Sequence, residues 1–184
     1  MLSAFTTRRK NERGFSLLEM MFATIILLVG LVAIAQLVPA SILLNYRNRN
    51  DSSALVFAQR ELDMMLDQPL VSKSFTDPNG VYCPLATTCN LGDPTQQNQV
   101  QGGPVVLVNN QAQIDFSNAT GIANWSFTYR DPNDPNGATY DIRWAVIITG
   151  NGTTVSSKRF ILGVRQQGGN GFFLPIKLDA MVEK

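Results

Sequence analysis

The sequence contains no histidine, which removes the commonest general base and the commonest metal ligand from its candidate chemistry. It also has no Gly-x-Ser-x-Gly nucleophile motif, no phosphate-binding loop and no clustered metal ligands. Its two cysteines cannot form a zinc site without further ligands. We therefore predict that the protein is not an enzyme and that it carries no metal and no cofactor.

Charge is sparse, at 16% of 184 residues, and it is unevenly spread. Residues 1–14 hold four basic side chains, Arg8, Arg9, Lys10 and Arg13, against Glu12, a net charge of +3. The rest of the chain has eleven basic and thirteen acidic residues, a net charge of −2. Bulk charge therefore argues against nucleic acid as a partner.

The longest stretch without charge begins at Met20, and it is almost continuously apolar as far as Leu44. As a helix these residues would be about 37 Å long, and the hydrocarbon core of a bilayer is about 30 Å thick. The basic cluster before them should stay in the cytoplasm and direct the rest of the chain outward. We predict a single-pass membrane helix over residues 15–44, with Pro39 kinking its axis.

One carboxylate, Glu19, lies at the start of this apolar segment. A charge at the centre of a membrane helix costs about 2.5–3.5 kcal/mol, so we expect Glu19 to be functional and to need a cationic partner. Two simpler interpretations are a secretory signal cleaved at Ala33-Ile34-Ala35 and a plain single-pass anchor. Neither of them explains Glu19.

The segment Gly14-Phe15-Ser16-Leu17-Leu18-Glu19, with its basic leader and apolar helix, resembles the class III signal of type IV prepilins and type II secretion pseudopilins. The resemblance implies that a prepilin peptidase removes the leader, residues 1–14, by cutting after Gly14, and then N-methylates Phe15. It also implies that Glu19 pairs with the terminal amine of a neighbouring subunit. The implied partners are the peptidase, other pilin or pseudopilin subunits, the inner-membrane assembly platform and the membrane itself.

The same resemblance places the chain in the bacterial inner membrane with its head in the periplasm, and then in a pilus or pseudopilus. Weaker likenesses in residues 54–62, and around residues 143–146 and 158–161, favour a minor type IV pilin of the V type. The alternatives are a minor pseudopilin of a type II secretion system, a DNA-uptake or adhesive tip pilin, and a membrane-anchored periplasmic protein that never polymerises.

Residues 45–68 are predicted to continue the helix beyond the membrane and to end before Pro69. Apolar residues recur there at spacings of three and four, which is typical of one buried helix face. The predicted face consists of Ala54, Leu55, Ala58, Leu62, Met65 and Leu66, and Arg60, Glu61 and Asp63 lie off it.

Residues 69–184 are predicted to form a β-rich head that begins with a long loop, residues 70–104, rich in turn signals. Behind an export signal, Cys83 and Cys89 are expected to form a disulfide, and two free thiols are the alternative.

Alternating or short apolar runs predict strands in the rest of the head. The predicted strands are residues 105–108, 111–116, 122–130, 140–146, 155–164 and 172–178. We expect an α+β fold, in which an antiparallel sheet packs one face on the long N-terminal helix as in pilins. Residues 131–137, rich in Asp, Asn and Pro, are predicted as a hairpin turn, with a calcium loop as the alternative.

Overall fold

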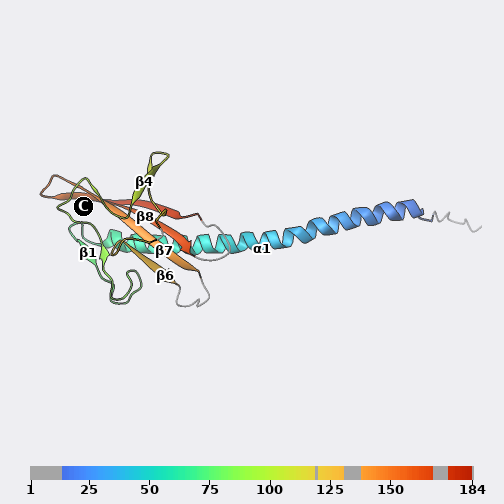
Figure 1. The fold of residues 1–184 in the computed structure, drawn as a ribbon, viewed down its shortest axis with the longest axis horizontal. Helices are drawn as coiled ribbons and strands as arrows, with labels where there is room; N and C mark the ends of the chain where they lie inside the picture. The colour runs from blue at the N-terminus through green and yellow to red at the C-terminus, as the bar shows by residue number, and fades with distance from the viewer. Residues whose placement is uncertain (1–13, 119, 131–137, 168–173, 184) are drawn as a thin grey trace, which may run out of the picture. The chain divides into compact units, whose positions relative to one another are not determined.

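The computed structural model describes residues 14–118, 120–130, 138–167 and 174–183 (Figure 1). It has the predicted α+β arrangement, with one long N-terminal helix followed by antiparallel strands. The chain divides into two compact units, with the boundary between Tyr46 and Arg47. The predicted leader, up to residue 13, lies outside the described residues.

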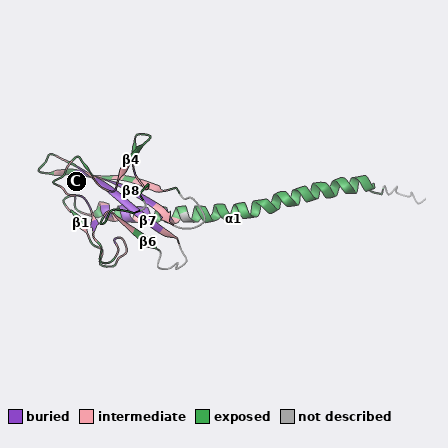
Figure 2. Ribbon diagram, viewed as in Figure 1, coloured by how far each residue is buried: buried purple, intermediate pink, exposed green. Residues whose placement is uncertain are grey.

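Helix α1 spans Leu17–Asp67 and continues without a break through Pro39. It ends one residue before Gln68, as predicted, because a residue that precedes proline disfavours helical backbone angles. Every residue from 14 to 49 is exposed (Figure 2). By length and composition alone, the apolar part of α1 is sufficient to cross a membrane.

Nine strands lie in the described part of the head. They are β1 Ser74–Phe75, β2 Cys89–Asn90, β3 Val100–Gly102, β4 Val105–Val108, β5 Gln111–Ile114, β6 Ser126–Arg130, β7 Thr139–Gly150, β8 Val155–Gln167 and β9 Ile176–Glu183. Strands β7 and β8 form the centre of a five-stranded antiparallel sheet, and β9 pairs with the other edge of β8. The other edge of β7 is shared, because β6 pairs with its first half and β3 with its second half.

The first core lies between this sheet and the second part of α1. Ala54, Ala58, Leu62 and Met65 are buried there, as predicted, against alternate side chains of β7 and β8 that include Trp144 and Phe160. The predicted face was wrong at Leu55, which is exposed.

The predicted helix face was also wrong at Glu61, which is only 3% exposed. Glu61 follows Ala58 by three residues and precedes Met65 by four, so it lies within the buried stripe and not beside it. Its Oε1 atom has no hydrogen-bond partner among the described residues. The space around it, about 10 Å³, has room for no more than one water molecule, and its other lining residues are Phe57, Arg60, Val81, Phe127, Tyr129 and Ile142.

The opposite face of the sheet is covered as well, which differs from the one-sided packing predicted. The hairpin of β4 and β5 places Ile114 against Ala145 and Ile161 in a second, smaller core. Gly163 is necessary for this approach, because a Cβ there would lie 2.7 Å from the Phe116 ring. Strands buried on both faces carry nearly continuous apolar runs, and this was the overlooked signal in β7 and β8.

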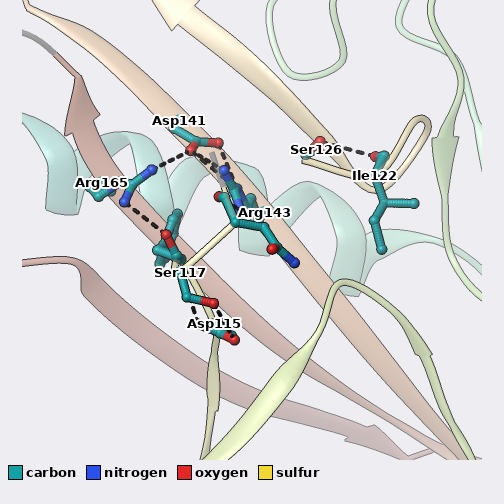
Figure 3. Close-up of polar contacts among 9 residues, drawn as sticks. Asp115, Ser117, Ile122, Ser126, Asp141, Arg143 and Arg165 are labelled. Atoms are coloured by element: carbon teal, nitrogen blue, oxygen red, sulfur yellow. Dashed lines mark hydrogen bonds and ion pairs between the residues drawn. The ribbon is translucent and has the colours of Figure 1, made fainter. Parts of the chain in front are cut away.

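A buried charge cluster fastens the chain after β5 to the sheet (Figure 3). The guanidinium of Arg143, 1% exposed, donates to both carboxylate oxygens of Asp141 and, at 2.9 Å, to the carbonyl of Asn118. Arg165 donates to Asp141 at 3.3 Å and to the carbonyl of Phe116 at 3.0 Å. The Phe116 ring lies near both guanidinium groups.

Several predicted strand boundaries need correction. Strand β6 begins at Ser126 and not at residue 122, because Trp125 N–H closes a turn onto the carbonyl of Ile122 at 3.0 Å. Strand β5 ends at Ile114. Strand β9 extends to Glu183, well beyond the predicted end at residue 178, because its pairing with β8 continues to Ser157. The start of that predicted strand, at residues 172 and 173, lies outside the described residues.

We predict that the head loses stability as pH rises from about 5 to 7.5. Burial raises the pKa of Glu61 from 4.5 to about 8, with a further increase from Asp77 and an opposing effect from Arg60. The folded head therefore holds the Glu61 proton more tightly than the unfolded chain does. The stability that this provides is complete below pH 4.5 and is lost as pH rises through 8. Thermal unfolding of the full chain in lipid nanodiscs at several pH values measures how the melting temperature of the head falls with pH. Glu61→Gln should make this dependence flatter.

Other titrating groups contribute little in this pH window. Burial lowers the pKa of Lys158 to about 8, so below that value Lys158 is charged in both folded and unfolded states. Hydrogen bonds from Thr95 and Ser117 lower the pKa values of Asp93 and Asp115, which therefore titrate below the window. An equal slope in wild type and Glu61→Gln would contradict the assignment.

We also predict that Arg143→Met destabilises the head by about 3 kcal/mol or more, because it leaves the buried Asp141 carboxylate poorly compensated. The double change with Asp141→Leu should cost less than Arg143→Met alone, since it removes both charges. Urea unfolding of the full chain, followed by tryptophan fluorescence, measures both. The control is Arg159→Met, which breaks a half-exposed pair with Asp179 and should cost at most about 1 kcal/mol. A double variant less stable than Arg143→Met would contradict the prediction.

Candidate functional site

The predicted processing site lies directly before the first turn of α1. Ser16 is the N-cap residue: its Oγ accepts a hydrogen bond from the N–H of Glu19 at 3.2 Å, and its carbonyl accepts one from Met20. A serine at the N-cap with a glutamate three residues later is the sequence pattern of a capping box. The helix therefore begins at Leu17, and the bond between Gly14 and Phe15 lies outside it.

Glu19 lies in the first turn of α1, and it is exposed. Its carboxylate makes no hydrogen bond and no ion pair within the described residues, so its charge is available to a group outside this chain. The helix N-terminus itself favours a negative charge at this position, because the first N–H groups carry partial positive charge. Between residue 14 and Arg47, Glu19 is the only charged residue in the sequence.

Gly14 and Phe15 are exposed, and Phe15 has 75% of its surface accessible. A Cβ placed on Gly14 would meet no atom of the described residues within 4 Å. The fold of this chain therefore does not require glycine at position 14. A large exposed aromatic residue beside a glycine that packing does not require is consistent with recognition of this segment by another protein.

Residues 9–35 match the family model described as the prokaryotic N-terminal methylation motif. The chain carries the class III signal of type IV pilins and pseudopilins. The matched range contains Gly14, Phe15 and Glu19 and includes more than half of the apolar segment, so it identifies the signal and not the head. No curated protein and no solved structure matches the chain.

The class III signal implies processing by a prepilin peptidase and assembly with other pilins, and the apolar helix that follows it is consistent with membrane anchoring. The roles predicted for Gly14, Phe15 and Glu19 individually remain predictions.

The predicted disulfide between Cys83 and Cys89 is present, with the two Cα atoms 6.0 Å apart. Both cysteines are buried in the main core, close to Leu91. The bond therefore closes a small loop within the long loop, and the burial of both cysteines packs this segment into the core. Residues 131–137, considered as a calcium loop, lie outside the described residues, and no group of three potential acidic or cysteine metal ligands occurs in the described ranges.

Four buried charged residues were missed by the sequence analysis. Glu61 could have been found by completing the spacing of the helix stripe. Lys158 is buried and donates to the carbonyl of Ser72 at 2.6 Å, and the pair of Asp141 and Arg143 lies on the second face of β7. Asp141, Arg143 and Lys158 alternate with core residues along their strands, so the sequence alone suggested that they lie on a solvated face.

Proposed function

We propose that this protein is a minor type IV pilin, a structural or assembly-priming subunit of a bacterial pilus. It is held in the inner membrane by the first part of α1 with its head in the periplasm. A prepilin peptidase cleaves after Gly14 and N-methylates Phe15, and the mature subunit then enters a filament. The observation that carries the proposal is the match of residues 9–35 to the N-terminal methylation motif.

The exposure of the apolar segment supports this proposal. Large side chains from Phe15 to Leu44 are exposed, and soluble proteins rarely leave so long an apolar surface uncovered. Lipid would cover this surface before assembly, and the helices of neighbouring subunits would cover it in a filament. Gly30 suits such close contact because it has no side chain. Packing within this chain does not require a glycine there, since a Cβ would meet no atom within 4 Å.

Glu19 would direct the subunit into place. An unpaired carboxylate is strongly disfavoured in hydrocarbon, and so is the ammonium group of an unpaired N-terminus. A methylated amine keeps its positive charge, so pairing Glu19 with the methylated Phe15 amine of a neighbouring subunit offsets both penalties. Only one axial offset between helices allows this contact, which gives the assembly its register.

The choice of machine rests on weaker features. The segment Ala54–Leu62 resembles minor pilins of the V type, and it also resembles the I-type pseudopilin of type II secretion. A minor pseudopilin is therefore the second candidate. Both candidates require the same processing and the same role for Glu19, so the experiments below test the common mechanism.

We predict that Gly14→Val blocks processing without affecting the head. Valine adds a branched side chain where a peptidase must approach the backbone, and it has no neighbour to disturb within this chain. Intact-mass measurement of protein from host membranes should show wild type beginning at methylated Phe15 and the variant retaining its leader. Gly30→Ala is the matched control, because it also changes an exposed glycine of the same segment, and it should be processed normally.

Other outcomes of the mass measurement would overturn the proposal. A wild-type chain that begins at Gln36 would indicate an ordinary signal peptide, and an intact chain would indicate a simple membrane anchor.

We predict that Glu19→Ala leaves membrane insertion and cleavage intact but reduces recovery in the sheared filament fraction by about tenfold or more. The estimate follows from losing a charge-assisted contact worth about 1.5–3 kcal/mol. Glu19→Gln should also fail, because the partner needs a charge. Asp63→Ala, which removes an exposed carboxylate from the same helix, is the control and should assemble normally. Normal recovery of Glu19→Ala would refute the pairing role.

A further inference from the structure

A polar cleft of about 460 Å³ opens on the head, away from the class III signal in sequence. Its walls come from the start of the head, the chain between β2 and β3, and the turn before β6. The residues that matter for its chemistry are Lys73, Thr88, Asp93, Gln96, Asn124 and Trp125. A volume of this size is within the range of small-ligand sites in proteins.

Trp125 is held in a fixed position at the cleft. Its indole lies against Gly102, which has φ of +106°, and any Cβ at that position would overlap the ring. The ring centroids of Trp125 and Trp144 are 6.4 Å apart, and the backbone N–H of Trp144 donates to the backbone carbonyl of Trp125 at 3.1 Å. The chain therefore uses a glycine in a conformation that other residues rarely adopt to place an aromatic ring at the cleft.

The rest of the cleft is pre-formed by hydrogen bonds. The amide of Gln101 accepts from Asp93 N–H at 2.6 Å and donates to the carbonyls of Asp93 and Gln96 at 3.1 and 2.8 Å. Asn90 N–H donates to the carbonyl of Asn124 at 2.8 Å, which joins β2 to the turn that carries Trp125. A ligand would therefore meet walls whose backbone is already ordered, and little backbone conformational entropy would be lost on binding.

The cleft is balanced in charge but rich in unused hydrogen-bonding groups. Lys73 Nζ lies 3.1 Å from Asp93 Oδ1, so the two charges compensate each other. In the described part of the chain, the side chains of Thr88, Gln96 and Asn124 make no hydrogen bond. Hydroxyl and amide groups each offer both a donor and an acceptor, which is what neighbouring hydroxyl groups of a ligand require.

We propose that this cleft binds a neutral carbohydrate, as one or two sugar rings of a larger glycan. Its vicinal hydroxyls would pair with the amides of Gln96 and Asn124 and the hydroxyl of Thr88, and its apolar C–H face would lie against the Trp125 indole. An anionic ligand is disfavoured because Asp93 already compensates Lys73. The mostly polar lining equally disfavours an apolar ligand.

The test uses the full chain in lipid nanodiscs prepared without glycolipids and without sugar-headed detergents. The chain is applied to an array of neutral and anionic mono- to tetrasaccharides. The best neutral sugar is then titrated in solution, with tryptophan fluorescence as the readout. We expect selective binding of neutral glycans and a fluorescence change on titration.

Two variants locate the site. Asn124 has φ of +66°, so Asn124→Gly removes the amide while keeping a backbone conformation that glycine accepts readily. It should weaken binding about three- to tenfold, the loss expected for one or two uncharged hydrogen bonds, and Thr88→Val should weaken it similarly. The matched control is Asn109→Gly, which changes an asparagine with φ of +51° in the turn between β4 and β5, and binding should be unchanged.

Two results would overturn the proposal: no neutral glycan bound above background, or equal affinities for Asn124→Gly and Asn109→Gly with both variants folded. Neither processing nor polymerisation is required for this experiment. The carbohydrate site and the pilin assignment can therefore fail independently.

Discussion

The pairing of β7 with β8 is the constraint on which the rest of the head depends. Their ladder runs from Thr139 opposite Gln167 to Gly150 opposite Val155, and most of its residues are buried on both faces. Alternate side chains of one parity form the core under α1, and those of the other parity meet the β4–β5 hairpin. Because strand side chains alternate strictly, a shift of one residue in this ladder would exchange the two cores and disrupt both.

This two-sided burial also explains why charged groups lie inside so small a head. Asp141, Arg143 and Lys158 belong to the same two strands, and each has protein atoms above it where a solvated face would have water. Asp141 and Arg143 compensate each other, whereas Lys158 depends on the carbonyl of Ser72. For Glu61 the effect of Arg60 is smaller than that of burial, so its carboxyl remains neutral over much of the pH range. The head thus joins its layers partly through polar contacts, which require particular partners and so specify how each layer is placed.

Much of this architecture could be predicted from the sequence, for identifiable reasons. Pro69 marks the end of α1, short turn-forming segments separate the strands, and the export signal before Cys83 and Cys89 indicates a compartment in which they form a disulfide. The continuous apolar run at residues 144–148 indicates burial on both faces, but nothing local shows that the group covering Ala145 and Gly163 is a hairpin distant in sequence. Glu61 was misplaced because charge was taken as evidence of exposure, although its spacing placed it in the stripe. The cleft depends on tertiary contacts between β2, β3 and Trp125, which no local pattern encodes.

The capping of α1 by Ser16 has a consequence for maturation. All hydrogen bonds that start the helix come from Ser16 and the residues after it, so a cut after Gly14 would remove no part of α1. Helix α1 would therefore be the same before and after the cut. What would change is electrostatic: a leader with a net charge of +3 is lost, and a new cation appears four residues before Glu19. Maturation would then require no refolding, and a storage form would become an assembly form through charge alone.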